Sequence, residues 1–314
     1  MDETPGMTGS PRISVVVPTV DRVALLERTL RGLAAQDAEG FEAIVVHDGD
    51  AAIVGLLDHW QDRLPLRALH IAERGAVAKR NAGWRAASAP LIAFTDDDCE
   101  PAPGWLKAAL AAFDDGDPRV DLVQGRVDTH PEDAHVDGLF KRSVEVHQHY
   151  EGYPNANLIY RRRALERVGG YDDAYWGASE DSDLAFRVIE TGGEVRYVDD
   201  AVVWHAVRPV GFFDHLKSLP RWANGPLTMK RHPQLRPLVH HRIFWKPMHT
   251  SGALALLGLV LAPFNWRLAA LVAPHFARRI RGAGIRGGTQ LALADIAEVA
   301  VTVAGSLRYR TVFI

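Results

Sequence analysis

The chain has 314 residues, of which 47% are hydrophobic and 24% charged, so it can bury the core of one large domain or of two ordinary ones. This composition excludes a disordered protein, and the single cysteine, Cys99, excludes an intramolecular disulfide framework. Residues 1–10 are acidic and contain no apolar run, which predicts a flexible N-terminus and no signal peptide.

The formal net charge of −3 hides an uneven distribution of charge along the chain. From His205 to the C-terminus there are 15 Lys and Arg against three acidic residues, a balance of +12. The first 204 residues hold the other 21 Lys and Arg and 36 Asp and Glu, a balance of −15. An acidic part followed by a basic part predicts two regions with different partners. Nucleic acid and an anionic membrane surface are both candidates for the basic part.

Strands and helices are predicted to alternate regularly from residue 13 to residue 95. The apolar runs predict buried strands at 13–18, 41–48, 66–71 and 91–95. Amphipathic or short helices are expected between them, at 23–36, around Leu57 and at 75–88. Such alternation with short connections predicts an α/β fold, with a mostly parallel sheet covered by helices on both faces. Beyond residue 102 the order is less regular, with a helix expected at 104–113 and a strand at 120–127.

Three consecutive aspartates, Asp96 to Asp98, follow the fourth predicted strand in the stretch LIAFTDDDCEP. Aspartate is common in turns, so a solvated turn is one interpretation. The other is a cation site, because open α/β sheets bind ligands at the carboxyl ends of their strands. The sequence has no G-x-G-x-x-G after the first strand and no P-loop, so a bound nucleotide diphosphate would need another source of positive charge. A divalent cation held by these carboxylates would supply it, since Mg²⁺ and Mn²⁺ take carboxylate and phosphate oxygens together.

A second acidic group occurs in SEDSDLAFRV, where Glu180, Asp181 and Asp183 fall in the first turn of a predicted helix. Ser179 could cap that helix and the acidic residues would then stabilise its N-terminus, which is a complete structural explanation. The glycine-rich, aromatic segment before it also allows a functional one. A carboxylate at this position could serve as a general base that takes a proton from an incoming hydroxyl.

Six motifs in order and at the right spacing resemble the family 2 glycosyltransferases of the GT-A fold. They cover about residues 11–206 and read VVVPTVDR, IVVHDGD, AKRNAGWRAA, IAFTDDDCEPAPGWL, NLIYRRRALERVGGYDD and SEDSDLAFRV. The resemblance implies a nucleotide-sugar-binding, Rossmann-like domain. It also implies the transfer of a sugar from a nucleotide diphosphate to an acceptor hydroxyl, with inversion and with Mg²⁺ or Mn²⁺ as cofactor.

The resemblance also implies roles for individual positions. Donor-binding residues would be Pro18, Thr19, Asp21, Asp48, Arg80, Asn81, Asp96 and Asp97. The metal would be bound by Asp98, with Asp96 and His205. Asp181 would be the catalytic base, paired with Glu180, and the acceptor side would include Asn157, Gly169, Gly170 and Trp176. His205 has an alternative interpretation as a histidine that ends a buried strand.

Two departures from the family pattern bear on the substrates. The sequence HDGD stands where the family often has DDGS, so Asp50 replaces a small residue; a uracil base is favoured, but the base stays open. The Q-x-x-R-W motif of the processive relatives is incomplete, because Ser218 stands in place of Gln before Arg221 and Trp222. We therefore expect a non-processive enzyme. The alternatives are a nucleotidyltransferase with an acidic metal site and an inactive nucleotide-sugar-binding module.

Residues 207–314 predict a basic, helical C-terminal region. Its apolar runs, at 251–264 and 268–277, are each shorter than the about 20 residues that span a bilayer. They predict a helical hairpin that either packs as a soluble core or dimer interface, or associates with a membrane surface. The basic charge favours peripheral or monotopic attachment to the cytoplasmic face of the plasma membrane, with a lipid-linked or cell-envelope glycan as acceptor. Because apolar runs separate the charges, nucleic acid is not expected as a partner. The oligomeric state stays open.

Overall fold

The computed structural model describes residues 10–73 and 75–314, which form two compact units. The predicted flexible N-terminus therefore lies outside the described residues, except for Ser10. The first unit, here called the sheet unit, comprises residues up to Val136, Arg142–Trp176 and Glu180–Arg208. The second, the helical unit, comprises Asp137–Lys141, Gly177–Ser179 and Pro209–Ile314.

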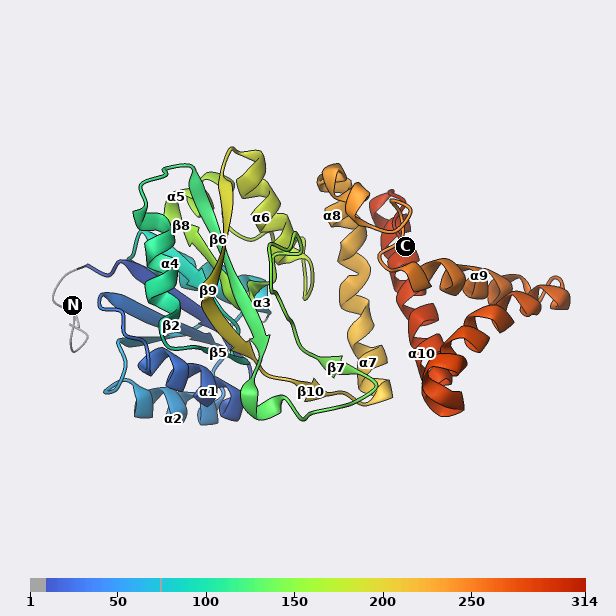
Figure 1. The fold of residues 1–314 in the computed structure, drawn as a ribbon, viewed down its shortest axis with the longest axis horizontal. Helices are drawn as coiled ribbons and strands as arrows, with labels where there is room; N and C mark the ends of the chain where they lie inside the picture. The colour runs from blue at the N-terminus through green and yellow to red at the C-terminus, as the bar shows by residue number, and fades with distance from the viewer. Residues whose placement is uncertain (1–9, 74) are drawn as a thin grey trace. The chain divides into compact units, whose positions relative to one another are not determined.

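An eight-stranded sheet forms the centre of the sheet unit, in the order β3-β2-β1-β4-β8-β6-β9-β5 (Figure 1). Its strands are β1 (Ile13–Pro18), β2 (Phe41–His47), β3 (Leu66–His70), β4 (Leu91–Phe94), β5 (Cys99–Pro101), β6 (Val120–Thr129), β8 (Leu158–Arg161) and β9 (Glu194–His205). The strands β3, β2, β1 and β4 are parallel, as the alternating pattern predicts. The sheet as a whole is mixed, because β8 pairs antiparallel with β4 and β6, and β5 pairs antiparallel with β9.

Helices cover both faces of this sheet, as expected. They are α1 (Val23–Ala34), α2 (Ala51–Trp60), α3 (Ala76–Ala86), α4 (Trp105–Asp114), α5 (Arg162–Val168) and α6 (Glu180–Glu190). Alternate side chains of β1 point to opposite faces of the sheet. Val15 and Val17 pack in the core with α1, α2 and α4, whereas Val16 lies against Gly83 of α3. All six residues of β1 are buried, which explains why its sequence is apolar almost throughout.

Two short strands and several 3₁₀ turns complete the connections. The strands β7 (Lys141–Arg142) and β10 (Arg208–Pro209) pair with each other, and 3₁₀ turns occur at Pro131–Asp133 and Asn155–Asn157. Asp50, the residue that departs from the family pattern, caps α2 by accepting hydrogen bonds from the backbone N–H groups of Ala52 and Ile53. Its replacement of a small residue therefore has a local structural role.

The helical unit contains α7 (Phe212–Ser218), α8 (Gly225–Arg231), α9 (Pro247–Leu261) and α10 (Ala273–Tyr309), with 3₁₀ turns at Leu219–Asn224, Pro233–Leu238 and Trp266–Val272. The helix α10 is interrupted at Gly284, whose φ of 70° and ψ of 174° are not helical. Arg279 before the break and Asp295 after it form a bidentate ion pair at 2.6 and 2.7 Å. The chain therefore reverses its direction within α10.

A further apolar stretch extends beyond the two runs at 251–264 and 268–277. Among the described residues, Trp266–Tyr309 is long and apolar enough to cross a membrane by length and composition, although the break at Gly284 divides it. The core helix of a soluble protein passes the same test, and 44% of the apolar window is buried inside the unit. Asp295 and Glu298 interrupt the apolar sequence of this stretch, and both are paired with basic residues in the fold.

Candidate active site

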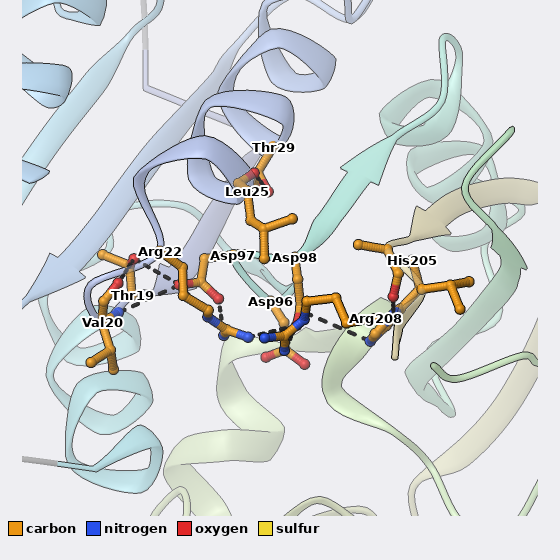
Figure 2. A network of polar contacts seen from close by, with 12 residues as sticks. Thr19, Val20, Arg22, Leu25, Thr29, Asp96, Asp97, Asp98, His205 and Arg208 are labelled. Atoms are coloured by element: carbon orange, nitrogen blue, oxygen red, sulfur yellow. Dashed lines mark hydrogen bonds and ion pairs between the residues drawn. The ribbon is translucent and has the colours of Figure 1, made fainter. Parts of the chain in front are cut away.

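The three consecutive aspartates follow β4 and are each paired with an arginine. Figure 2 shows this network, in which Arg22 reaches both Asp97 and Asp98. Asp98 also accepts a hydrogen bond from Arg208 at 3.0 Å, through the same oxygen, Oδ2, that Arg22 contacts at 2.6 Å. A solvated turn does not describe these residues, because Asp97 is fully buried and Asp98 is 8% exposed.

Asp97 connects the aspartates to the first loop of the sheet. Its Oδ2 accepts hydrogen bonds from the Thr19 hydroxyl at 2.7 Å and from the Arg22 Nε at 3.2 Å. Burial raises the pKa of Asp97 to about 6, in spite of the opposing charge of Arg22. In this structure Asp97 and Thr19, both predicted donor-binding residues, therefore bind each other and hold the loop that follows β1.

Asp98 and His205 form a candidate metal site. The His205 Nδ1 lies 2.7 Å from the Ala206 carbonyl oxygen, which can only accept, so Nδ1 carries the proton. In the neutral ring, Nε2 then directs its lone pair toward Asp98 Oδ1, at 3.6 Å. Two acceptors facing each other require a cation between them or a proton on the histidine. Burial alone would raise the pKa of Asp98, but the charges of His205, Arg22 and Arg208 outweigh it and hold that pKa below its ordinary value. Asp98 is therefore available as an anionic ligand.

Cys99 completes a group of three side chains, with Asp98 and His205, whose ligand atoms lie within 4.8 Å of one another. The thiol is fully buried, and burial raises its pKa well above the ordinary value. A protonated thiol is a poor ligand for a hard cation, so the carboxylate and the imidazole are the suitable donors. Asp96, also predicted as a ligand, is instead engaged by Arg80, whose Nη2 lies 2.6 Å from Asp96 Oδ1.

Arg80 connects the aspartates to the second acidic group. This fully buried guanidinium on α3 also donates from Nη1 to Glu180 Oε1, at 3.0 Å. Glu180 is the first residue of α6, and its other carboxylate oxygen is buried without a hydrogen-bond partner. Arg80 thus lies between Asp96 and Glu180, two carboxylates that come from sequence segments about 80 residues apart.

Asp181, the predicted base, has an environment suited to proton transfer. Burial and the neighbouring charge of Glu180 raise its pKa to about 7, so near neutral pH it can both accept and release a proton. Its Oδ1 accepts a hydrogen bond from the Ser182 N–H at 2.9 Å. Ser179, the expected helix cap, has a φ of 69°, which differs from the extended backbone of a usual cap.

The other predicted donor residues lie along the ends of β1 and β2. Pro18 ends β1, and Asp21 is exposed in the loop after it. Asp48, which directly follows β2, lies 3.2 Å from the ammonium of Lys79. Lys79 is fully buried and also donates to the Thr19 carbonyl oxygen at 2.5 Å. Lys79 therefore connects the loop that follows β1 to the loop that follows β2.

Asn81 and Gly170 hold a loop in place rather than facing an open cavity. Asn81 exchanges two hydrogen bonds with the backbone of Tyr171, at 2.9 and 3.0 Å, and accepts a third from the Trp84 indole. Gly170 has a φ of 76°, and a Cβ there would lie 2.7 Å from Asn81 Oδ1. These contacts fix the glycine-rich segment that leads to α6.

The remaining predicted acceptor residues differ in their surroundings. Asn157 is fully buried and bonds the Trp105 indole and the carbonyl oxygens of Arg126 and Ala201. Gly169 ends α5 with a φ of 80°. Trp176 is half-exposed. The predicted acceptor residues thus include buried, structural positions as well as one exposed side chain.

The sequence analysis assigned no site role to three basic residues of this network. Two of them lie inside its motifs, Arg22 in VVVPTVDR and Lys79 in AKRNAGWRAA. Nothing in the local sequence connects Arg208 with Asp98, because 110 residues separate the two.

Comparisons with known proteins identify the family and the fold of this chain. Residues 14–171 match the model of glycosyl transferase family 2, and residues 139–206 match one described as the N-terminal domain of galactosyltransferase. A pre-mycofactocin glycosyltransferase of Mycobacterium tuberculosis is 30% identical over 249 residues, covering 72% of this chain. A validoxylamine A glucosyltransferase of Streptomyces hygroscopicus is 27% identical over 284 residues, covering 77% of this chain.

The chain spans about half the length of the mycobacterial relative, 50%, and 65% of the Streptomyces one. Among solved structures, a mannosyltransferase from Pyrobaculum calidifontis in complex with GDP-Man and Mn²⁺ has a TM-score of 0.60 at 20% identity. That match covers 96% of this chain and 88% of the mannosyltransferase. The chain therefore belongs to glycosyltransferase family 2 and has the GT-A fold of its members.

Proposed function

We propose that this protein is a metal-dependent, inverting glycosyltransferase that moves a sugar from a nucleotide diphosphate to an acceptor hydroxyl. A UDP-sugar is the favoured donor, and transfer is non-processive. The observation that carries the proposal is the separation of two acidic centres. Asp98 faces His205 and is paired with Arg22 and Arg208, while Asp181 stays free of any ion pair in the described residues and has a pKa of about 7. In-line displacement at a sugar needs one group for the departing diphosphate and another for the incoming hydroxyl.

The donor set fits Mg²⁺ or Mn²⁺. Asp98 and His205 would hold the ion, and Asp98 is the anionic ligand, since nearby positive charge keeps its pKa low. When bound, such an ion neutralises charge on the diphosphate leaving group. Manganese accepts both imidazole and carboxylate ligands, so the presence of His205 favours Mn²⁺ over Mg²⁺.

Charge compensation and proton acceptance would be performed by side chains of the protein itself. Arg22 and Arg208 both contact Asp98 Oδ2, so either guanidinium can compensate negative charge that arrives beside this carboxylate. Asp181 would accept the proton of the acceptor hydroxyl at a carboxylate oxygen. Arg80 bonds both Asp96 and Glu180, so it would keep the aspartates after β4 at a fixed distance from the start of α6.

A screen of nucleotide sugars tests the proposal. The protein would be mixed with UDP- and GDP-sugars in the presence of Mn²⁺, and thermal stabilisation and release of the nucleoside diphosphate would be measured. We expect at least one donor to raise the melting temperature and to be hydrolysed slowly with water as acceptor. Binding without any turnover, with or without acceptors, would indicate an inactive binding module. Absence of both effects would contradict the proposal.

Membrane attachment is the second part of the proposal, and the surface of the helical unit supports it. Exposed apolar side chains occur on α9 and in the turn after it, with Val260 at 58%, Phe264 at 86% and Trp266 at 76% exposure. Arginines at 267, 278, 281 and 286 are exposed in the same segment of the chain. Apolar side chains beside arginines suit the boundary between anionic headgroups and acyl chains. We therefore propose a peripheral or monotopic protein on the cytoplasmic face of the plasma membrane, with a lipid-linked or cell-envelope glycan as acceptor.

A further inference from the structure

The sheet unit carries a half-exposed aromatic side chain, Tyr150, in a segment without regular secondary structure. This tyrosine is 47% exposed, whereas the neighbouring Tyr153 is buried. None of the motifs of the family resemblance includes it, because it lies between the strand β6 and the motif that begins at Asn157.

The backbone of Tyr150 is held rigidly at its position. Gln124 of β6 accepts a hydrogen bond from the Tyr150 N–H at 2.8 Å and donates one to the Tyr150 carbonyl oxygen at 2.9 Å. The tyrosine ring lies against Gly152, since a Cβ added there would collide with ring carbons Cε1 and Cζ. Part of the ring therefore lies against the backbone at Gly152, and 47% of the residue stays exposed to solvent.

The same segment is bound to the start of α6, where the proposed base is located. The Ser182 hydroxyl donates to the Gly152 carbonyl oxygen at 2.7 Å, and Ser182 directly follows Asp181. The ring of Tyr153 contacts Phe186, one turn further along α6, with centroids 5.5 Å apart. Burial and then the charge of Asp181 raise the pKa of Tyr150.

We propose that Tyr150 is the aromatic platform of the acceptor site, on which the sugar ring bearing the attacking hydroxyl stacks. A pyranose presents apolar C–H groups on its faces, and these suit the electron-rich face of an aromatic ring. Because the Tyr150 ring lies against Gly152 and Gly152 is bound to Ser182, a sugar stacked on this ring would have its hydroxyl held near the start of α6, where the proposed base is located. This assignment rests on the proposed function. It adds that the attacking hydroxyl of the proposed glycan acceptor belongs to a sugar ring that stacks on Tyr150.

The test compares Tyr150→Phe with Tyr150→Leu in the full chain. Phenylalanine keeps the flat ring and loses the hydroxyl, whereas leucine stays apolar and loses the ring. Methyl and p-nitrophenyl pyranosides would serve as acceptors, and hydrolysis of the donor would serve as the reaction that needs no acceptor. We expect the KM for the pyranoside to rise about tenfold in Tyr150→Leu, the equivalent of about 1.4 kcal/mol, and to change less than about twofold in Tyr150→Phe. Donor hydrolysis and the melting temperature should be the same in both variants.

The outcomes separate this inference from the proposed function. Equal KM values for the two variants, or loss of donor hydrolysis in Tyr150→Leu with an unchanged melting temperature, would contradict the acceptor platform. A wild-type protein that hydrolyses the donor but uses none of the pyranosides would contradict it as well, while leaving the proposed function intact. A wild-type protein that neither binds nor hydrolyses any donor would overturn the proposed function itself.

Discussion

Asp181 and Asp98 are both aspartates in the same sheet unit, but their surroundings give them opposite acid–base properties. Asp98 is surrounded by Arg22, Arg208 and His205, which lower its pKa. Asp181 has a carboxylate neighbour, Glu180, and burial raises its pKa to about 7. A permanently charged carboxylate suits a cation, and one that titrates near neutral pH suits proton transfer. The environments of the two residues therefore agree with their proposed division of tasks.

The substitution Asp181→Asn tests the role of the base. Asparagine preserves the shape of the side chain but cannot take a proton, so we expect the transfer rate to fall by about 10²- to 10⁴-fold. Donor affinity, measured by calorimetry, should change little. In the wild type, kcat/KM should rise with pH up to about 7 and then level off, because the base must be deprotonated. A collapse of donor affinity with high residual turnover would make Asp181 a binding residue instead.

The same substitution should change how stability depends on pH. Because the folded-state pKa of Asp181 lies above its unfolded value, the folded protein holds this proton more tightly than the unfolded chain does. The resulting stabilisation is complete below the unfolded pKa and is lost as the pH rises through about 7. Asp181→Asn should therefore melt at a higher temperature than the wild type at pH 8, with a smaller difference at pH 5. An equal difference at both values would contradict the raised pKa.

At the level of single residues, the sequence predicted positions better than contacts. The aspartates after β4 and the proposed base could be singled out because the motifs that contain them are local. Their partners could not: Arg208 reaches Asp98 across 110 residues, and Arg80 reaches Glu180 across 100. Asn157 was predicted on the acceptor side, and its sequence motif could not show that its amide is already hydrogen-bonded. In the fold it bonds the Trp105 indole and the carbonyl oxygens of Arg126 and Ala201.

Among the secondary-structure elements, α3 depends on close packing against the sheet. Gly83 of this helix faces Val16 of β1 and Val46 of β2, and an added Cβ would collide with Val16 and lie 3.1 Å from Val46 Cγ2. The helix also carries Lys79 and Arg80, whose side chains bind the first loop and the acidic residues. The distance between α3 and the sheet thus determines where these two charges lie.

The substitution Gly83→Ala should destabilise the protein by about 1–3 kcal/mol, because the added methyl group overpacks the interface. Urea denaturation would measure the loss. The matched control is Gly55→Ala in α2, where an added Cβ meets nothing within 4 Å and alanine should stabilise the helix by about 0.5–1 kcal/mol. If Gly83→Ala stabilised the protein as Gly55→Ala is expected to, helix propensity rather than packing would determine the result, and the close packing of α3 against the sheet would be contradicted.

The elements show which parts of a fold are predictable from local sequence. The strands β1 to β4 have apolar runs bounded by turns, and the observed limits differ from the predicted ones by one residue at most. The short strand β5, Cys99–Pro101, was missed because its three residues carry no periodicity and its pairing partner β9 lies about 100 residues away. The antiparallel direction of β8 likewise follows from tertiary pairing with β4 and β6, which a strand pattern does not encode.

For the molecule as a whole, the charge asymmetry and the exposed apolar side chains of the helical unit predict membrane binding. The full chain should sediment with phosphatidylglycerol-containing vesicles and be only partly released by high salt, because salt screens charges but not apolar contacts. The double substitution Phe264→Glu and Trp266→Glu should abolish sedimentation, since both side chains are strongly exposed. Val54→Glu, an exposed position on α2, is the control and should have no effect. A wild-type chain that ignores vesicles and forms a soluble dimer would make this surface a subunit interface.

The most direct test of the molecule's function is calorimetric titration of UDP and GDP with Mn²⁺ present or removed by EDTA. Asp98 and His205 are proposed to hold the ion that the diphosphate requires, so one of the two nucleotides should bind the wild type in Mn²⁺. Its affinity should fall at least about tenfold in EDTA, the equivalent of about 1.4 kcal/mol. Asp98→Asn should show the weak affinity under both conditions. Equal affinity of the wild type with and without the metal, or an Asp98→Asn variant that still responds to Mn²⁺, would contradict a metal-dependent glycosyltransferase site built on Asp98.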